Sequence, residues 1–357
     1  MSSYGIEFRQ VGKRYGDASS PLVVKGIDLQ VPKGTLTTIL GPSGCGKTTS
    51  LRMIAGLESP TAGTILIDGQ DVTTLGPAER NVSMVFQSYA LFPHMNVIEN
   101  VGYGLSVQGL SRDTTAQRAR AAMALVGLAG FEQRLPSELS GGQQQRVAVA
   151  RSLVLEPSVL LFDEPLSNLD ARLRRSMREE IRALQQRLQL TVAYVTHDQS
   201  EALAVSDQII VMDAGLIAQA GTPRQLYEQP ATEFVAGFMG EAMRFEAVVD
   251  EAGQVRLGPL RFAPRLPVAP GPVLVAVRPE AWQVAAVPSA DAATTPRDEW
   301  LTGTLRKTAY LGSFLELTVD TALGEVFVVS PEVDQHWQVG DELSLWLAQH
   351  GVSVVAG

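Results

Sequence analysis

The chain has 357 residues, of which 45% are hydrophobic and 19% charged, values that are ordinary for a globular protein with a substantial core and that suggest roughly two domains. The net charge of −9 argues against nucleic acid as the main partner, because binding a phosphate backbone requires a basic face. The single cysteine excludes an internal disulfide framework.

Up to about residue 240, short β-type runs alternate with helical segments, which is typical of an α/β domain with a largely parallel sheet. The first runs differ from the later ones. Residues 6–11 and 26–31 alternate apolar and polar side chains, and residues 65–67 precede the hairpin signal Asp68-Gly69. These early runs predict an antiparallel sheet beside the main one.

Residues 41–49 read Gly-Pro-Ser-Gly-Cys-Gly-Lys-Thr-Thr and fit the phosphate-binding pattern G-x-x-x-x-G-K-[ST]. A β-rich stretch precedes them, and residues 50–56 predict a helix that ends at Gly56. A strand, a glycine loop and a helix start together form an anion cradle, because backbone N–H groups and the helix dipole face the phosphates. Lys47 would reach the β- and γ-phosphates, and the Thr48 hydroxyl would bind Mg²⁺. The expected nucleotide contacts of this loop are Gly41, Pro42, Ser43, Gly44, Cys45, Gly46, Lys47, Thr48 and Thr49.

Strand signals fade between about residues 93 and 138, and residues 118–126 are strongly helical by propensity. We expect a helical subdomain over about residues 88–155. Within it, the turn Ser140-Gly141-Gly142 precedes the helical residues 147–155. This turn exposes backbone N–H groups and a hydroxyl at a helix start, which predicts a second anion site.

The apolar run 159–162 ends in two carboxylates, Asp163 and Glu164. In a protein with a phosphate loop, Asp163 would hold Mg²⁺ directly or through water, and Glu164 would polarise the water that attacks the γ-phosphate. His197 follows another apolar run, at residues 191–195. Taken alone, the two carboxylates are equally typical of a solvated strand end, and a histidine after an apolar strand is more often a structural residue than a ligand contact. Beside the phosphate loop, they predict a catalytic centre in which His197 contacts the γ-phosphate.

The composition changes after residue 240. Five prolines lie between residues 259 and 272, and β-type runs such as 273–277 and 315–319 follow. These features predict a nucleotide-binding domain over residues 1–240 and a small all-β domain over residues 241–357. Residues 285–297 predict an exposed loop within that second domain.

The motifs together resemble the ATP-binding cassette (ABC) ATPases, whose signature sequence Leu-Ser-Gly-Gly-Gln stands at residues 139–143. By this resemblance, Tyr15 stacks on adenine, and Gln87 is the glutamine that senses Mg²⁺ and touches a membrane subunit. Residues 167–170 then form the loop that brings Asp170 to the nucleotide, and His197 is the switch histidine.

In that family, two copies face each other head to tail and enclose two ATP molecules. The resemblance therefore implies that Ser140, Gly141, Gly142 and Gln143 of one copy complete the ATP site of the other. The implied substrate is ATP with Mg²⁺, and the implied catalytic residues are Lys47, Gln87, Glu164 and His197. Thr48, Gln87 and Asp163 are the implied metal contacts.

Three segments of the second domain, residues 275–280, 310–312 and 340–341, resemble the OB-like (TOBE) C-terminal domain of bacterial importer ATPases. This domain either only packs and dimerises or also binds a regulatory ligand. The resemblance implies a peripheral subunit at the cytoplasmic face of the inner membrane, bound to permease subunits and served indirectly by a periplasmic solute-binding protein. No apolar run is long enough to span a bilayer, and residues 1–9 lack the apolar core of a secretory signal, which agrees with this location.

Residues 82–94 resemble the iron, polyamine and phosphonate branch of these importers as much as the sugar branch. Ferric iron is the favoured solute, with polyamine, phosphonate and sugar as alternatives. A rival interpretation is a soluble ABC-type ATPase that acts on DNA or ribosomes. Such proteins usually carry long coiled-coil insertions or two cassettes, and this chain has one cassette and no sustained heptads. A kinase built on the same phosphate loop is a third interpretation. The second half-site at Ser140–Gly142 argues against a kinase, which would need no such element from another copy.

Overall fold

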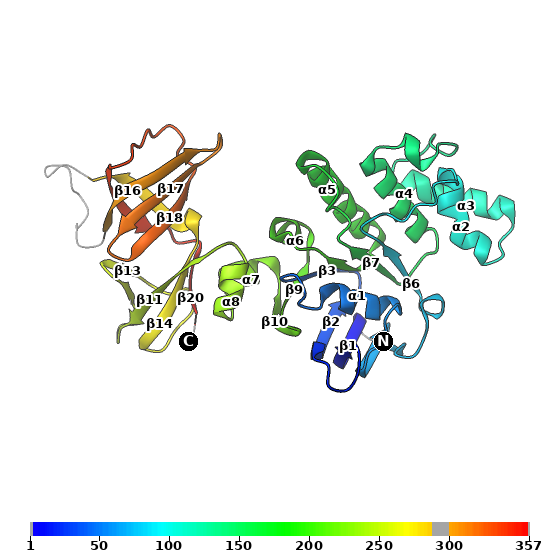
Figure 1. Ribbon diagram of the computed structural model, residues 1–357, viewed down its shortest axis with the longest axis horizontal. Helices are drawn as coiled ribbons and strands as arrows, with labels where there is room; N and C mark the ends of the chain where they lie inside the picture. The colour runs from blue at the N-terminus through cyan, green and yellow to red at the C-terminus, as the bar shows by residue number, and fades with distance from the viewer. Residues whose placement is uncertain (1–2, 288–299, 356–357) are drawn as a thin grey trace. The chain divides into compact units, whose positions relative to one another are not determined.

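The computed structural model describes residues 3–287 and 300–355 of the chain, which divides into two compact units, Met1–Pro223 and Arg224–Gly357 (Figure 1). The division falls ahead of the boundary that we expected near residue 240, so residues 224–240 belong to the second unit. Across the described residues, no helix combines the length and apolar composition that a membrane crossing requires.

The main sheet of the first unit has the strand order β10-β9-β3-β8-β7-β6. Neighbouring strands from β9 to β6 run parallel, and β10 pairs antiparallel with β9. The expected, largely parallel sheet is therefore present. Its strands in chain order are β3 (Leu36–Leu40), β6 (Val82–Val85), β7 (Val159–Asp163), β8 (Thr191–Val195), β9 (Gln208–Asp213) and β10 (Leu216–Gly221).

A second, antiparallel sheet has the order β2-β1-β4-β5, as the alternating early runs predict. Asp68 and Gly69 both have positive φ and form the β4–β5 turn, which confirms the hairpin. The strands are β1 (Tyr4–Arg14), β2 (Leu22–Pro32), β4 (Ala62–Ile67) and β5 (Gln70–Asp71).

Both faces of the main sheet are buried, which explains its almost wholly apolar strands. On one face, Leu161 and Val195 pack with helix α1 (Lys47–Ala55) and with the antiparallel sheet. On the other face, Leu160 and Tyr194 pack with α5 (Ala171–Leu188) and with part of α4 (Gly141–Leu153). A short helix, α6 (Gln199–Val205), follows β8.

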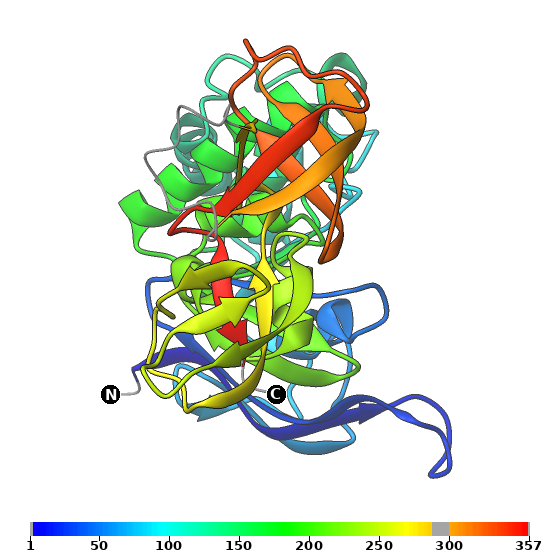
Figure 2. The same ribbon diagram turned by 90° about the vertical axis from the view of Figure 1, so that its left-hand side faces the viewer.

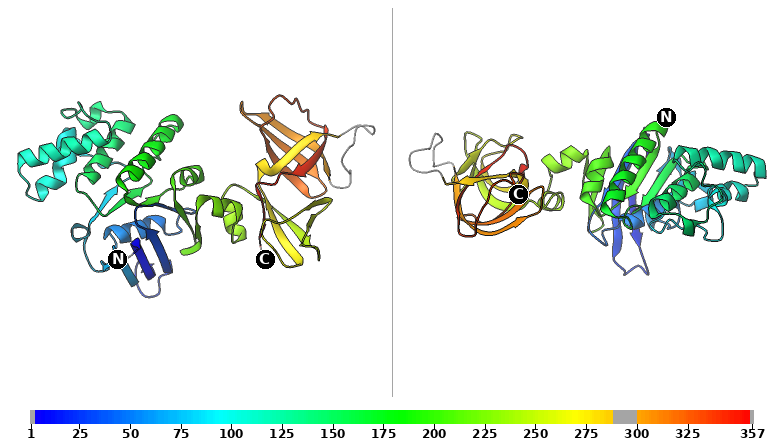
Figure 3. Two further views of the ribbon diagram at one scale, coloured as in Figure 1. Left: turned by 180° about the vertical axis from the view of Figure 1, so that it is seen from behind. Right: turned by 90° about the horizontal axis from the view of Figure 1, so that it is seen from above.

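The expected helical subdomain contains α2 (Val97–Val107), α3 (Arg112–Leu125) and α4, which Figure 3 shows from behind. The three helices share a core of their own that includes Val101, Met123 and Val147. Because α4 also packs on the main sheet through Val149 and Leu153, it joins the subdomain to the nucleotide-binding core.

The second unit contains two five-stranded antiparallel sheets, with orders β13-β12-β11-β14-β20 and β15-β19-β16-β17-β18 (Figure 2). One hydrophobic core spans both sheets, as a small β-barrel domain requires. The strands are β11 (Met243–Val249), β12 (Val255–Leu257), β13 (Leu260–Phe262), β14 (Gly271–Val277), β15 (Trp282–Ala286), β16 (Leu301–Tyr310), β17 (Leu315–Thr321), β18 (Gly324–Ser330), β19 (Glu342–Leu347) and β20 (Val352–Val355).

The loop predicted at residues 285–297 needs a correction at its start. Ala285 and Ala286 belong to β15, where they pair with Ser344 and Leu343 of β19. Residues 288–297 lie outside the described residues.

Two short helices, α7 (Pro223–Glu228) and α8 (Glu233–Phe238), precede the β-strands of the second unit, and a buried arginine holds α7. Arg278 is 2% exposed, its guanidinium carbon lies 3.6 Å from the centre of the Tyr227 ring, and its Nη2 donates to the Tyr227 carbonyl at 2.7 Å. The Tyr227 hydroxyl in turn donates to Glu280, and burial raises the pKa of Tyr227 to about 12. This cation–π and hydrogen-bond network fixes α7 to the β-domain.

Candidate nucleotide site

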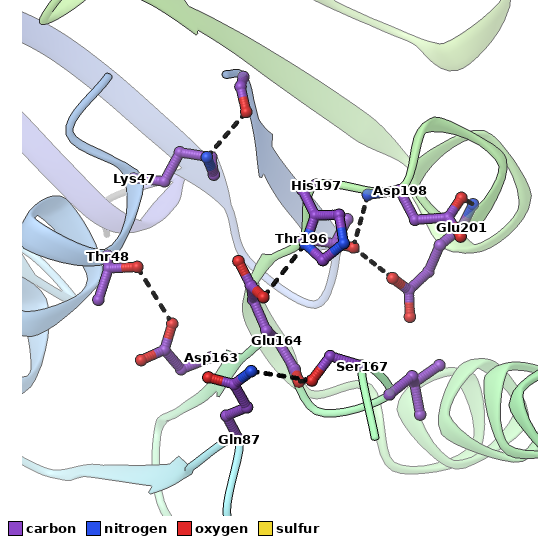
Figure 4. Close-up of polar contacts among 12 residues, drawn as sticks. Lys47, Thr48, Gln87, Asp163, Glu164, Ser167, Thr196, His197, Asp198 and Glu201 are labelled. Atoms are coloured by element: carbon purple, nitrogen blue, oxygen red, sulfur yellow. Dashed lines mark hydrogen bonds and ion pairs between the residues drawn. The ribbon is translucent and has the colours of Figure 1, made fainter. Parts of the chain in front are cut away.

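The strand order of the main sheet brings the predicted motifs to one edge. Strands β3, β8, β7 and β6 are neighbours, and four segments follow their carboxyl ends: the glycine loop, Thr196–His197, Glu164 and Gln87. The carboxyl edge of a parallel sheet is where α/β proteins bind ligands. Segments that are far apart in the sequence therefore meet around a common space (Figure 4).

The glycine loop leaves β3 and turns directly into α1. A Cβ on Gly41 would lie 2.3 Å from the Met212 carbonyl oxygen and 2.6 Å from Cys45 Sγ, so the backbone passes too close for any side chain. Lys47 is 7% exposed, and its Nζ donates to the carbonyls of Gly41 and Pro42 at 2.8 Å each. The lysine ammonium thus lies over the concave side of the loop, where phosphates would bind.

We expect Gly41→Ala to lower the free energy of unfolding of the first unit by about 1 to 3 kcal/mol, the usual cost of forcing an extra carbon into a packed site. Gly44→Ala is the matched control, because a Cβ there meets nothing within 4 Å and carries only the cost of its φ of 80°. Thermal unfolding followed by circular dichroism compares the two. Equal shifts would show that the contact with Met212 does not explain the glycine.

Thr48 and Asp163 face each other across the start of α1. The Thr48 hydroxyl donates to Asp163 Oδ1 at 3.4 Å. Burial raises the pKa of Asp163, with opposing contributions from Arg52 and Lys47. The pair therefore presents two oxygen atoms in a desolvated place where a bound cation would stabilise the carboxylate.

Glu164 and His197 form the centre of the cluster. The backbone of Glu164 is left-handed, with φ of 46°, an uncommon conformation that typically marks functional sites. His197 Nδ1 lies 3.1 Å from Glu164 Oε2. Because a carboxylate only accepts hydrogen bonds, the Nδ1–H group of His197 donates to Glu164 Oε2, and the other ring nitrogen, Nε2, faces away from Glu164.

Gln87 is tied to the same cluster through the loop after β7. Its Nε2 donates to Ser167 Oγ at 3.1 Å, and Ser167 Oγ donates to the Glu164 carbonyl at 3.0 Å. Asn168 Nδ2 donates to the Gln87 carbonyl at 3.1 Å. The resemblance places residues 167–170 in one loop near the nucleotide but names only Asp170 of them as a site residue. The bonds that Ser167 and Asn168 make to Gln87 were not predicted, because they join segments that are distant in the sequence.

A buried carboxylate supports the segment that carries His197. Glu201 is 3% exposed and accepts hydrogen bonds from the hydroxyls of Tyr194 and Thr196. The Thr196 hydroxyl also accepts from the Asp198 N–H at 3.0 Å. The Glu201 side chain from α6 thus holds Thr196 directly, and Thr196 in turn holds the backbone of Asp198 on the other side of His197.

The remaining predicted positions lie at helix ends and on the surface. Ser140 is the N-cap of α4 and shares a reciprocal capping box with Gln143. Asp170 is the N-cap of α5. Tyr15 is 45% exposed, and Lys13 Nζ lies 4.8 Å from the centre of its ring. Among the described residues, no hydrogen bond joins Tyr15, Ser140 or Asp170 to the cluster in Figure 4.

The two signature glycines lie close to leucine side chains near the start of α5. A Cβ on Gly142 would lie 2.9 Å from Leu173 Cδ1, and one on Gly141 would lie 3.3 Å from Leu169 Cδ2. The start of α4 is therefore pressed against the start of α5, with the exposed Ser140 at its tip.

Comparison with known proteins gives two family matches. The model of the ABC transporter family matches residues 24–167, and that of the TOBE domain matches residues 275–355. The chain is 53% identical to the Fe(3+) ions import ATP-binding protein FbpC 1 of Rhizobium meliloti (strain 1021), over 99% of this chain and 98% of that protein. It is 51% identical to FbpC of Brucella abortus (strain 2308), over 98% and 97%.

Two solved structures resemble the first part of the chain. The dimeric post-hydrolysis state of the ATP-binding cassette MJ0796, bound to ADP and Pi, aligns with a TM-score of 0.55 and 30% identity over 61% of this chain and 99% of that one. The cbiO1 protein of Clostridium perfringens aligns with a TM-score of 0.58 and 28% identity over 63% and 91%. These matches confirm the fold and the resemblance on which the sequence analysis depends, and the chain belongs to the ABC transporter family, as an ATP-binding subunit with a C-terminal TOBE domain.

Proposed function

We propose that this chain is the ATP-hydrolysing subunit of a bacterial importer of ferric iron. The observation that carries the proposal is the near-complete alignment, at 53% identity over 99% of the chain, with a protein named for Fe(3+) import. The alignment includes the TOBE domain as well as the ATPase unit, so the similarity extends beyond the common cassette. The chain would act at the cytoplasmic face of the inner membrane through permease subunits, and a periplasmic binding protein would deliver the iron.

Two copies would bind ATP head to tail. Within one copy, Ser140 lies at an exposed helix start that makes no hydrogen bond to the cluster around Glu164. The capping box uses the N–H groups of Ser140 and Gln143 and leaves those of Gly141 and Gly142 at the helix start. Such a helix start is an anion site, so the segment Ser140–Gln143 would bind the γ-phosphate held by the glycine loop of the other copy. The solved structure of the ATP-binding cassette MJ0796, a dimer bound to ADP and Pi, supports the pairing of two copies. Tyr15 would stack on adenine, and Asp170 would approach the nucleotide from the start of α5.

The residues around Thr48 fit Mg²⁺. Among the described residues, no group of three or more His, Cys, Asp or Glu side chains could hold a metal ion. Thr48, Asp163 and Gln87 supply only a few oxygen ligands, and Mg²⁺ typically takes its others from substrate phosphates and water. Thr48, Asp163 and Gln87 would hold the ion, and a bound Mg²⁺ would supply positive charge that offsets the charge of the phosphates.

The chemistry is in-line attack of water on the γ-phosphate, and this chain's side chains would bind and position the reactants. Lys47 would leave the loop carbonyls for phosphate oxygens. Glu164 Oε1 and Oε2 would orient the attacking water and accept its proton. His197 donates through Nδ1 to Glu164, so donation to phosphate through Nε2 requires a ring that carries both protons.

The solute is tested in cells. Deleting the gene should slow uptake of ferric iron, and the wild-type chain should restore it, whereas Glu164→Gln should not. Uptake of a polyamine, a phosphonate and maltose should not change. A deletion strain that takes up iron normally and loses uptake of one of the other solutes would contradict the iron assignment but not the ATPase assignment.

A further inference from the structure

Arg151, on the last turn of α4, holds the segment that follows Gln87. Its Nη1 donates to the Ala90 carbonyl at 2.6 Å, and its Nη2 donates to the Tyr89 carbonyl at 2.7 Å. The guanidinium carbon also lies 5.7 Å from the centre of the Phe92 ring. One arginine therefore bridges two consecutive carbonyls of a different segment, a use of the planar fork that a lysine does not reproduce.

The segment held in this way is strained. Tyr89 and Ala90 both have left-handed backbones, with φ of 59° and 47°. Side chains with a Cβ adopt this conformation at a cost and keep it only where the surroundings fix it. The Tyr89 ring is buried, and its hydroxyl has no hydrogen-bond partner among the described residues. The hydrogen bonds that fix the turn from outside therefore come from Arg151.

The other end of the segment belongs to the catalytic cluster. Gln87 bonds to Ser167 through its side chain and to Asn168 through its carbonyl, and Ser167 bonds to the carbonyl of Glu164. Residues 87–90 thus run from the catalytic centre at one end to α4 at the other. Polar contacts bind both ends.

Helix α4 connects Arg151 to the signature turn. The helix runs from Gly141 to Leu153 without interruption, and its N-cap is Ser140. A helix of this kind moves as a rigid body, so a displacement of the Tyr89–Ala90 carbonyls is passed to Ser140. We propose that Arg151 is a positioning residue that couples Gln87 to Ser140, so that a γ-phosphate sensed in one copy's site sets the signature turn that serves the other copy's site. This inference rests on the head-to-tail function proposed above.

The test uses the full-length chain and the variant Arg151→Met, which keeps an unbranched apolar side chain of about the length of the arginine stem and removes the guanidinium donors. We expect affinity for a fluorescent ATP analogue to stay within about twofold of the wild type. We expect the ATPase rate to fall by about tenfold, the size of a typical coupling between sites, and its cooperative dependence on ATP concentration to be lost. A residue that only stabilises the fold would not separate binding from cooperativity in this way.

Arg118→Met is the matched control, because Arg118 also donates to a backbone carbonyl near the end of α4, that of Val154 at 3.1 Å, but comes from α3. It should leave cooperativity unchanged. Arg151→Lys, which keeps the charge and can donate to one carbonyl, should recover part of the rate and serves if Arg151→Met fails to fold.

A double-mutant cycle with Gln87→Ala decides between coupling and general damage. If Arg151 acts through the Gln87 segment, the double variant is no slower than Gln87→Ala alone. Rate losses that multiply, or a cooperative Arg151→Met enzyme, would overturn the inference while leaving the proposed function intact. A wild-type chain without cooperative ATPase activity would also overturn the inference, whereas the proposed function is decided by the uptake test.

Discussion

Replacing Glu164 by glutamine should lower the rate of phosphate release by about 100- to 10,000-fold, the range expected when a positioned general base is removed. Glutamine has the same shape and can still accept the hydrogen bond from His197 Nδ1, which lies 3.1 Å from Glu164 Oε2. It cannot accept a proton from water. ATP binding should therefore persist, and the variant should accumulate as an ATP-bound dimer. Phosphate release and size-exclusion chromatography with ATP measure the two effects.

The matched control is Glu179→Gln on α5, where the carboxylate is exposed and pairs with Arg175 four residues earlier. It should leave both rate and binding unchanged, because exposed ion pairs contribute little. Turnover by Glu164→Gln at a tenth of the wild-type rate or more would assign the proton transfer to another group.

The second large effect is on stability. Glu201→Ala should lower the free energy of unfolding of the first unit by about 2 to 6 kcal/mol, because it leaves the buried hydroxyls of Tyr194 and Thr196 without their acceptor, at about 1 to 3 kcal/mol each. A loss of this size is a large fraction of the stability of an ordinary domain. The segment that carries His197 would also lose its support, so ATPase activity should fall with stability.

The composition of the chain allows the two units to be followed separately. Its four tryptophans, at positions 282, 300, 337 and 346, all lie in the second unit, so tryptophan fluorescence reports that unit alone. Helices α1 to α6 lie in the first unit, and far-ultraviolet circular dichroism mainly follows them. Glu201→Ala should therefore shift the unfolding transition seen by circular dichroism and leave the one seen by tryptophan fluorescence unchanged.

Tyr194→Phe provides the internal check on this mechanism. Combined with Glu201→Ala, it removes one of the unpaired hydroxyls, so the double variant should be less destabilised than the sum of the single variants. Strictly additive losses would mean that the unpaired hydroxyls are not the cause.

Much of the site was predictable because local patterns and sheet topology carry the same information. The glycine loop, Asp163–Glu164 and His197 each follow an apolar run, and parallel strands place such positions at one edge. The resemblance to ABC ATPases added Gln87 and Ser140, which no single pattern identifies. The capping box of Ser140 was also readable, because Gln143 stands three residues after a serine.

The features that were missed depend on contacts between distant residues. Arg151 gave one weak signal, a charge within a largely apolar helical run, and its partners at Tyr89 and Ala90 lie 61 or 62 positions earlier in the chain. The position of the unit boundary depends on the packing of Arg278 against Tyr227, which no composition change marks. The residues that we propose carry the chemistry were therefore easier to predict than the residues that hold them in place.

The most direct test of the account is whether the glycine loop of one copy faces the signature turn of another. The background is Cys45→Ala with Glu164→Gln, which contains no native thiol. In this background, one tagged chain carries Ser43→Cys, and a second chain with a different tag carries Ser140→Cys. Both serines are exposed. The account predicts that oxidation with ATP and Mg²⁺ gives a disulfide between the two different chains and that omitting ATP removes it. A disulfide that joins Ser43→Cys chains to each other in place of that product, or no ATP-dependent product at all, would contradict the head-to-tail arrangement.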